Sequence, residues 1–305
     1  MSKRLRLEHD YAEQLRQEAE EEDDKLKKQQ ERIFAPITWA RFHNGFRIID
    51  LKEKHFGDVI ELIKEHYIPV EVLCRNAEIE EDEVSLKSFL DELMFNMRDS
   101  TSIIAIHESS NELAAVLILR IVNKIDYSRV FTRIAFNEGE ARKKCTAIIN
   151  ALSRKNDVYK IMNCDTFLYY SLLCVNPTYR HKALGYQLMR IGLDVAVSLK
   201  VPVAMGIFSN FKMQKAARKL NFKLIQEVSY TNWRDKNNEL IFGDPGAGNY
   251  SCALMICSVP PGGTTDPLVI KELSPAETRV VQPPRTRLEK RVKLERSKNP
   301  TSTTA

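Results

Sequence analysis

Between residues 46 and 122, apolar and polar positions repeat with two different periods, one typical of strands and the other of helices. Residues 46–51 predict a short strand, and residues 55–67 and 84–97 repeat their apolar positions at helical spacing. Residues 102–107 and 112–122 are strand-like runs separated by four polar residues, which suit a hairpin loop. The pattern therefore predicts a strand, two helices and a β-hairpin, in that order.

The part of the chain from residue 138 to residue 259 alternates between the same two periods. Residues 138–152 predict a helix, and residues 167–175 are nearly all apolar or aromatic, as in a central strand covered on both faces. Residues 183–199 return to helical spacing. The remaining elements predicted are a buried strand at 201–208, a basic amphipathic helix at 212–220 and paired strands at 222–230 and 251–259. This order predicts an α+β (α/β) fold around one mixed sheet.

Both ends of the chain differ in composition from residues 41–259, which we assign to one domain. Residues 1–40 are dominated by charged residues and Gln, and they predict a helical or disordered extension. A coiled-coil or partner helix is the alternative, but sustained heptads are absent. Residues 260–305 predict a disordered, Pro- and Thr-containing basic tail, which is either solvated or binds an acidic partner. The protein partners of these charged ends are not identified by the sequence.

Charge and cysteine content narrow the class of protein. The 46 basic and 41 acidic residues nearly balance, so nucleic acid is not an expected partner. The six cysteines contain no C-x-x-C pair and no histidines at zinc-ligand spacing, so we expect reduced thiols and no metal. Neither a signal-like apolar region nor a membrane-spanning run is present. A cytoplasmic location is expected, with nuclear import as an alternative because of the basic tail.

Residues 172–185 have the features of an anion-binding site. A buried strand runs into a tight loop at the start of a helix, where unpaired backbone N–H groups and the helix dipole favour negative charge. Ala183 and Gly185 are small enough for a phosphate group to approach the backbone. Arg180 and Lys182 add positive charge. An ordinary strand–helix turn is the alternative interpretation.

At these residues the sequence resembles the GNAT acetyltransferase superfamily, whose coenzyme A motif is Arg/Gln-x-x-Gly-x-Gly/Ala. The motif reads Arg180-x-x-Ala183-x-Gly185 here, with alanine at the first glycine position. The resemblance implies a mixed central sheet with helices on both faces, and acetyl-CoA as cosubstrate. The coenzyme-binding residues that it implies are Leu173, Cys174 and Val175 for the pantetheine arm, and Arg180, His181, Lys182, Ala183, Leu184 and Gly185 for the pyrophosphate.

More narrowly, residues 46–259 resemble the insect-type arylalkylamine N-acetyltransferases. Residues 65–75 are similar to the family's Asp-Glu-Pro-Leu segment, and residues 228–235 with 241–242 are similar to its Tyr-Ala-Asp-Tyr strand. The coenzyme motif lies between these two stretches. Three separated similarities are more specific than any one of them.

The resemblance assigns two catalytic roles. The family's general base falls on Glu71, which would take a proton from the substrate ammonium group. Its flanking residues here are Val70 and Val72, where the family has Asp and Pro. Ser209 falls on a family serine that is a candidate proton donor to the departing thiolate, and Met213 replaces a second one.

The sequence leaves open which group donates a proton to the thiolate and whether the reaction has a covalent intermediate. Tyr186, Tyr230 and Tyr250 are alternative proton donors, although each also suits a packed aromatic role. The family's late Pro-His corresponds to residues 249–250, Asn-Tyr. Cys174 offers a covalent route, but a thiol within a buried strand is usually inert.

The expected function is an acetyl-CoA-dependent N-acetyltransferase that acts on a primary amine, as the resemblance implies an arylalkylamine, by direct attack in a ternary complex. Two alternatives remain open at this stage. One is a non-catalytic acyl-CoA-binding or scaffold homologue, and the other is an acetyltransferase for other amines or protein lysines.

Overall fold

The computed structural model describes residues 36–126, 137–259 and 270–271, together with residues 16, 20 and 27. All of these belong to one compact unit, Met1–Leu273. Most of the charged N-terminal extension and nearly all of the basic tail predicted for residues 260–305 therefore lie outside the described residues.

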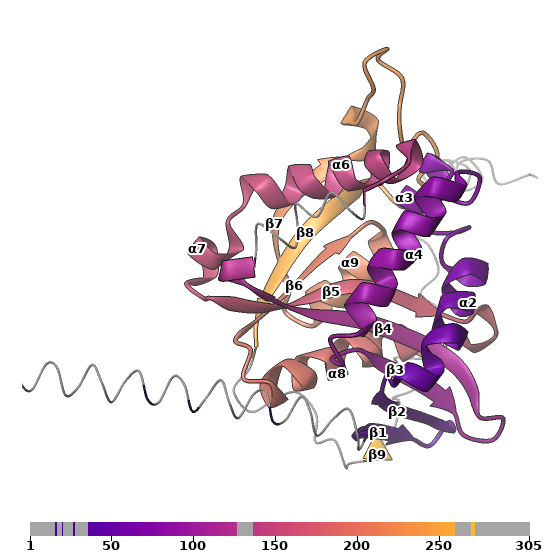
Figure 1. Cartoon of the computed structure of the whole chain (residues 1–305), viewed down its shortest axis with the longest axis vertical. Helices are drawn as coiled ribbons and strands as arrows, with labels where there is room; N and C mark the ends of the chain where they lie inside the picture. The colour runs from indigo at the N-terminus through magenta and orange to yellow at the C-terminus, as the bar shows by residue number, and fades with distance from the viewer. Residues whose placement is uncertain are drawn as a thin grey trace, which may run out of the picture. The chain divides into compact units, whose positions relative to one another are not determined.

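A nine-stranded sheet crosses the unit in the order β7-β8-β6-β5-β4-β3-β2-β1-β9 (Figure 1). Its strands are β1 (Thr38–Phe42), β2 (Phe46–Asp50), β3 (Ile103–His107), β4 (Glu112–Asn123), β5 (Thr166–Val175), β6 (Val203–Phe208), β7 (Lys223–Ser229), β8 (Ser251–Ser258) and β9 (Ile270–Lys271). The β5–β6 and β1–β9 pairs are parallel and the other pairs are antiparallel. The predicted mixed sheet, with the 167–175 strand at its centre, is confirmed.

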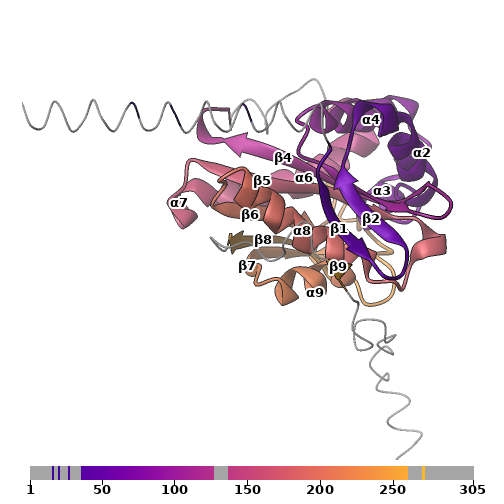
Figure 2. The ribbon, with the colours of Figure 1, turned by 90° about the horizontal axis from the view of Figure 1, so that it is seen from below.

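Helices cover both faces of this sheet, as the resemblance implied. The helices are α2 (Phe56–His66), α3 (Val72–Ala77), α4 (Glu83–Met97), α6 (Glu140–Lys155), α7 (Val158–Met162), α8 (Leu184–Ser198) and α9 (Phe211–Lys219), with short 3-10 helices η1 (Glu53–His55), η2 (Lys124–Asp126), η4 (Pro177–Tyr179) and η5 (Tyr230–Asn232). One hydrophobic cluster packs α2, α3, α4, α6 and α7 on one face, and a second packs α8 and α9 on the other (Figure 2).

The elements predicted from periodicity are present within a few residues of their predicted bounds. The structure adds β1, α3, α7 and β9, which are too short to show a period. Strand β1 starts at Thr38, so the sheet includes residues that precede the domain start predicted at residue 41. The β1–β2 turn uses Gly45, whose φ of 82° lies in the left-handed region and whose N–H donates to Phe42 O at 3.0 Å.

The sheet opens between its two central strands. Parallel pairing of β5 with β6 runs from Leu168–Ala204 to Tyr170–Gly206, although both strands continue further. Leu119 and Ile118 of β4 pair with Tyr170 and Leu172 of β5 and leave Ser171 without a partner on β4. This shift in register marks a β-bulge. From Ser171 onward the edge of β5 that faces β6 is therefore not paired with it.

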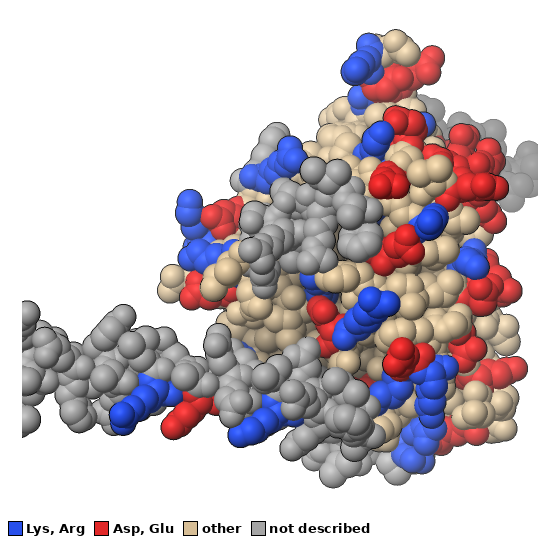
Figure 3. Space-filling model, viewed as in Figure 1, with Lys and Arg blue, Asp and Glu red and all other residues tan. Residues whose placement is uncertain are grey.

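Surface charge is mixed in the described part of the chain. On the face shown in Figure 3, acidic side chains gather beside α2 and α4, and Lys and Arg side chains are scattered among other residues. Among the described residues no helix has the length and hydropathy to cross a membrane. The same residues contain no group of three or more His, Cys, Asp or Glu side chains that is arranged to hold a metal ion.

Candidate active site

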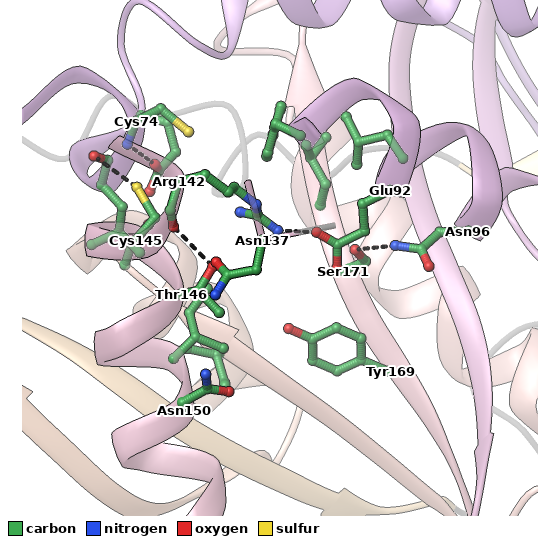
Figure 4. A pocket seen from close by; sticks show the side chains of 18 of the residues that line it. Cys74, Glu92, Asn96, Asn137, Arg142, Cys145, Thr146, Asn150, Tyr169 and Ser171 are labelled. Atoms are coloured by element: carbon green, nitrogen blue, oxygen red, sulfur yellow. Dashed lines mark hydrogen bonds and ion pairs between the residues drawn. The ribbon is translucent and has the colours of Figure 1, made fainter. Parts of the chain in front are cut away.

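A cavity of about 400 Å³ lies on the α2–α6 face of the sheet. Its walls come from separate elements: α4 contributes Glu92 and Asn96, α6 contributes Arg142, and β5 contributes Tyr169 and Ser171 (Figure 4). Its volume is within the range of small-molecule sites, which is roughly 300–1,000 Å³.

A second, smaller cavity of about 40 Å³ lies where α9 begins, lined in part by Leu173 and Met213. The two cavities share five lining residues: Tyr67, Ser171, Leu172, Ile207 and Ser209. Four of these five lie on or directly after β5 and β6, beyond the last β5–β6 pair. The opening between the strands therefore joins a large cavity on the α4–α6 side to a small one on the α9 side.

Glu71 lines the large cavity, and its residue is only 7% exposed. It is the N-cap of α3, and its Oε2 accepts a hydrogen bond from the Cys74 N–H at 2.7 Å. This bond fixes the carboxylate at the helix start, where the dipole favours negative charge. The side chain of Cys74 is hydrogen-bonded to Glu71 as well, so the first turn of α3 holds the carboxylate at the cavity wall. Of its flanking valines, Val72 is buried while Val70 is 54% exposed.

Tyr67 is a site residue that sequence reasoning did not select. It lines both cavities together with Ser209. Burial, and secondarily the charge of Glu71, raise the pKa of its hydroxyl well above the usual value, so the phenol keeps its proton at neutral pH. The sequence signal was its position four residues before Glu71, within the stretch that resembles the family.

The other predicted proton donors lie in different surroundings. Ser209 follows β6, and its carbonyl oxygen accepts a hydrogen bond from the Tyr230 hydroxyl. Tyr230 is buried, and burial raises the pKa of its hydroxyl. Tyr250 is 76% exposed and Tyr186 lies on α8, and neither of them lines either cavity. The structure therefore brings Glu71 and Ser209 to one cavity and leaves Tyr186 and Tyr250 outside it.

The loop between β5 and α8 presents a row of unpaired amides. Within the described residues, no backbone N–H from residue 181 to residue 186 donates a hydrogen bond to a protein acceptor. Ala183 is in the left-handed region, with φ 57° and ψ 13°, and the helical Leu184 follows it. Such a pair turns successive N–H groups toward one point and forms an anion-binding concavity.

Gly185 has a packing role in addition. A Cβ at this position would lie 3.3 Å from Leu173 Cδ2 and 3.6 Å from Val175 Cγ2. The missing side chain therefore lets α8 lie close against the unpaired end of β5. This places the amide-rich helix start beside the strand edge to which the family resemblance assigns the pantetheine arm.

The basic side chains of the loop between β5 and α8 have different surroundings. His181 is exposed, with φ 66°. The Lys182 Nζ lies 5.4 Å from the centre of the Phe46 ring and 5.6 Å from that of Tyr179, so its charge rests against aromatic faces. Arg180 is close enough to Cys174 to influence its thiol.

Cys174 lies in the core under α2 and not in the loop between β5 and α8. Its Sγ lies 3.8 Å from Leu62 O, and the residue is 3% exposed. Burial raises the pKa of this thiol to about 12, against a smaller lowering by Arg180. A thiol with that pKa is almost entirely protonated at neutral pH, which disfavours a covalent route through it.

A part-buried ion pair crosses the large cavity, and it was also missed by sequence reasoning. Arg142 of α6 is 7% exposed and pairs with Glu92 of α4 (Figure 4). Its guanidinium lies 5.3 Å from the centre of the Phe89 ring. Burial lowers the pKa of Arg142 from its usual value. The two residues are 50 positions apart in the chain, so no local sequence pattern predicts that they pair.

No protein-family model and no curated protein sequence matches the chain. Solved structures do match it. Arylalkylamine N-acetyltransferase 2 from Aedes aegypti has a TM-score of 0.64 at 22% identity, covering 71% of this chain and 100% of that one. A putative arylalkylamine N-acetyltransferase 7 from the same mosquito has a TM-score of 0.63 at 20% identity, covering 74% and 96%.

The Drosophila melanogaster polyamine N-acetyltransferase is a further match, with a TM-score of 0.58 at 15% identity, over 70% of this chain and 99% of that chain. These similarities cover nearly the whole length of each solved structure. The chain therefore has the GNAT acetyltransferase fold, as the insect arylalkylamine N-acetyltransferases do.

Proposed function

We propose that the protein is an acetyl-CoA-dependent N-acetyltransferase that acetylates a small primary amine by direct attack in a ternary complex. The observation that carries the proposal is the junction of the two cavities at the β5–β6 opening, with the held carboxylate of Glu71 in the larger one. The similar structures bear names that give arylalkylamines and polyamines as acceptors. These acceptors share the primary amine, and arylalkylamines are the class that the sequence resemblance implies.

Acetyl-CoA would enter along the free edge of β5. The main-chain groups of residues 173–175 that face β6 have no partner there, so an extended pantetheine arm can pair with them as a strand does. The amides of residues 181–186 would hold the pyrophosphate. The thioester would then lie near the residues that line both cavities.

The chemistry follows from this placement. The carboxylate of Glu71 takes a proton from the ammonium group, and the free amine attacks the thioester carbonyl carbon. The C–S bond of the resulting tetrahedral intermediate breaks, and the thiolate takes a proton from Tyr67 or Ser209, which line both cavities. The second proton of the attacking nitrogen restores that donor, so the single proton taken by Glu71 is the one released to solvent. Holding both substrates at this junction replaces an encounter in solution by a reaction within one complex.

The test is acetyl transfer by Glu71→Gln protein. Glutamine retains a side-chain oxygen for the Cys74 N–H and so preserves the α3 cap, but it cannot take the proton. We expect kcat to fall by about 10²–10⁴-fold in a thiol-release assay, with acetyl-CoA binding retained. Glu65→Gln, which changes an exposed carboxylate of α2 outside both cavities, is the matched control and retains activity.

The same assay separates the alternatives. Coenzyme A binding without transfer to any amine would support a non-catalytic acyl-CoA-binding protein and contradict the proposal. Transfer to lysine peptides in preference to every small amine would assign a protein acetyltransferase instead. Unchanged turnover in Glu71→Gln would remove the role of this carboxylate as general base.

A further inference from the structure

One wall of the large cavity is a polar stripe along α6. Every fourth residue from 142 to 154 lines the cavity, and these residues are Arg142, Thr146, Asn150 and Arg154. Residues four apart lie on one helical face, so the stripe extends for about 18 Å at 1.5 Å per residue. The α6 stripe contains two guanidinium groups, one at each end, and no carboxylate.

The acidic groups of the cavity lie on other elements. Glu71 caps α3, and Glu92 of α4 forms an ion pair with Arg142. Among the described residues no carboxylate forms an ion pair with Arg154, whose residue is exposed. The cavity therefore has an acidic group near the opening between β5 and β6, and a cationic group toward the C-terminal end of α6.

Two further side chains of the cavity wall, those of Tyr169 and Asn150, can donate hydrogen bonds. The Tyr169 hydroxyl lies in the cavity beside α6 (Figure 4), and burial raises its pKa to about 12, so it keeps its proton. The Asn150 amide lies two turns beyond Arg142 on the same face. Arg142 is paired with Glu92, so within the described residues the guanidinium of Arg154 carries the uncompensated positive charge of the α6 stripe. This guanidinium, together with the phenol and the amide of the cavity wall, suits an anionic oxygen, and its charge opposes a second ammonium group.

From this arrangement we infer that the acceptor is a primary amine that also carries a carboxylate several bonds away. Its amine lies at Glu71 and its carboxylate lies against the α6 stripe. The inference rests on the proposed function, because Glu71 is assigned there as the base. It excludes dicationic acceptors as preferred substrates, since their second ammonium group would face Arg154 without an acidic partner in the described part of the cavity.

The experiment compares acceptors that differ only in the distal group. The series is ω-amino acids of four to eight carbons, each matched by the alkylamine and the diamine of the same length, for example δ-aminovalerate, pentylamine and cadaverine. We expect kcat/KM for the best ω-amino acid to exceed that of its matched alkylamine by about tenfold, as for one partly desolvated charge pair. The diamine should be the poorest of the three.

Arg154→Glu is the decisive variant because residue 154 is exposed and its replacement leaves the core intact. We expect it to reverse the order, with the diamine preferred to the ω-amino acid. Lys160→Glu makes the same charge change on an exposed side chain of α7 that lines neither cavity, and it should keep the wild-type order. Calorimetric titration of the same acceptors into the coenzyme A complex measures the preference independently of turnover.

Failure of this inference can be distinguished from failure of the proposed acetyltransferase function. Efficient transfer to pentylamine or cadaverine with no advantage for any ω-amino acid would overturn the inference and leave the acetyltransferase proposal intact. An advantage that Arg154→Glu does not reduce would also overturn it. If no acceptor is acetylated, selective calorimetric binding of the ω-amino acid would still support the inference, and equal or absent binding of all three would contradict it.

Discussion

Ala183 is in an unfavourable backbone conformation at the point where the coenzyme would bind. Its φ of 57° places it in the left-handed region, and it is the N-cap of α8 without making a side-chain cap hydrogen bond. Residues with a Cβ are strained there, whereas glycine is not. The alanine that departs from the family motif is therefore held in a conformation for which glycine is better suited.

We predict that Ala183→Gly stabilises the protein by up to about 1 kcal/mol. Relief of left-handed strain contributes roughly 1–2 kcal/mol, and the greater freedom of glycine in the unfolded chain offsets part of it. Urea unfolding measures the difference. Ala196→Gly, within the same helix, is the matched control and should lose about 1 kcal/mol or more. A loss at both positions would show that Ala183 is not strained.

Cys174 supports a second prediction at this scale. Because its pKa is raised to about 12 by burial, almost no thiolate forms near neutral pH, and the thiol faces the core under α2. After incubation with acetyl-CoA and rapid quenching, we expect no acetyl group on the Cys174 peptide by mass spectrometry. An acetylated Cys174 peptide that disappears when amine is added would instead establish a covalent route.

At the scale of elements, the starts of α4 and α6 are fastened to one another, and this contact sets the two helical walls of the cavity. Asp82 caps α4 through Ser85, and its Oδ2 also accepts from the Ala141 N–H at 3.3 Å. The Ser85 hydroxyl in turn accepts from the Arg142 N–H at 2.8 Å. The position of Arg142 opposite Glu92 depends on this contact.

Gly139 lies directly in the α4–α6 contact. Its φ is 84°, and an added Cβ would lie 2.1 Å from Ser85 Oγ, 2.5 Å from Ser85 N and 2.8 Å from Ser85 Cα. We predict that Gly139→Ala destabilises the protein by about 1–3 kcal/mol, because it combines backbone strain with overpacking. Gly57→Ala in α2 has nothing within 4 Å and should be neutral or stabilising by up to about 1 kcal/mol. Thermal or urea unfolding of the two variants checks the contrast.

Asp82 also makes the stability of this contact depend on pH. Its hydrogen bonds with Ser85 lower its pKa from 3.8 to about 2. A carboxyl whose pKa is lower in the folded state stabilises the fold above its unfolded pKa, and this contribution is lost as pH falls through the folded value. We predict that part of the stability is lost between about pH 4 and pH 2, measured by urea unfolding. In Asp82→Asn this part of the pH dependence should disappear, and an unchanged profile would contradict the assignment.

At the scale of the whole described unit, we expect the opening between β5 and β6 to link the binding of coenzyme A to the stability of the fold. The edge of β5 beyond Tyr170 and the start of α8 both have unpaired main-chain groups. Since a ligand that pairs with them binds only the folded state, it must raise the free energy of unfolding.

We predict that coenzyme A at 100 times its Kd stabilises the protein by about 2.7 kcal/mol, seen as a higher melting temperature. Pantetheine, which lacks the pyrophosphate, should stabilise less at equal concentration. Arg180→Glu combined with Lys182→Glu should reduce the shift with coenzyme A and leave that with pantetheine nearly unchanged. An equal response to both ligands in the wild type would contradict a pyrophosphate site at α8.

Much of the fold could be predicted because its signals are local. The 167–175 strand and the 183–199 helix are long enough for hydrophobic periodicity to identify them, and both are found within one residue of the predicted bounds. The short α3 escaped prediction, since six residues show no period. Glu71 and Ser209 came from resemblance to a family, and their presence in one cavity required the folded chain.

The sequence by itself determined the order of strands and helices and the segment where a strand meets a helix start, because both depend on residues close together in the chain. Only the tertiary structure decided the large cavity, whose lining includes Glu71, Glu92, Arg142, Tyr169 and Ser209. These residues are brought together by packing of α3, α4 and α6 on a sheet that splits after Tyr170. Such packing joins distant parts of the chain, and so no local pattern encodes it.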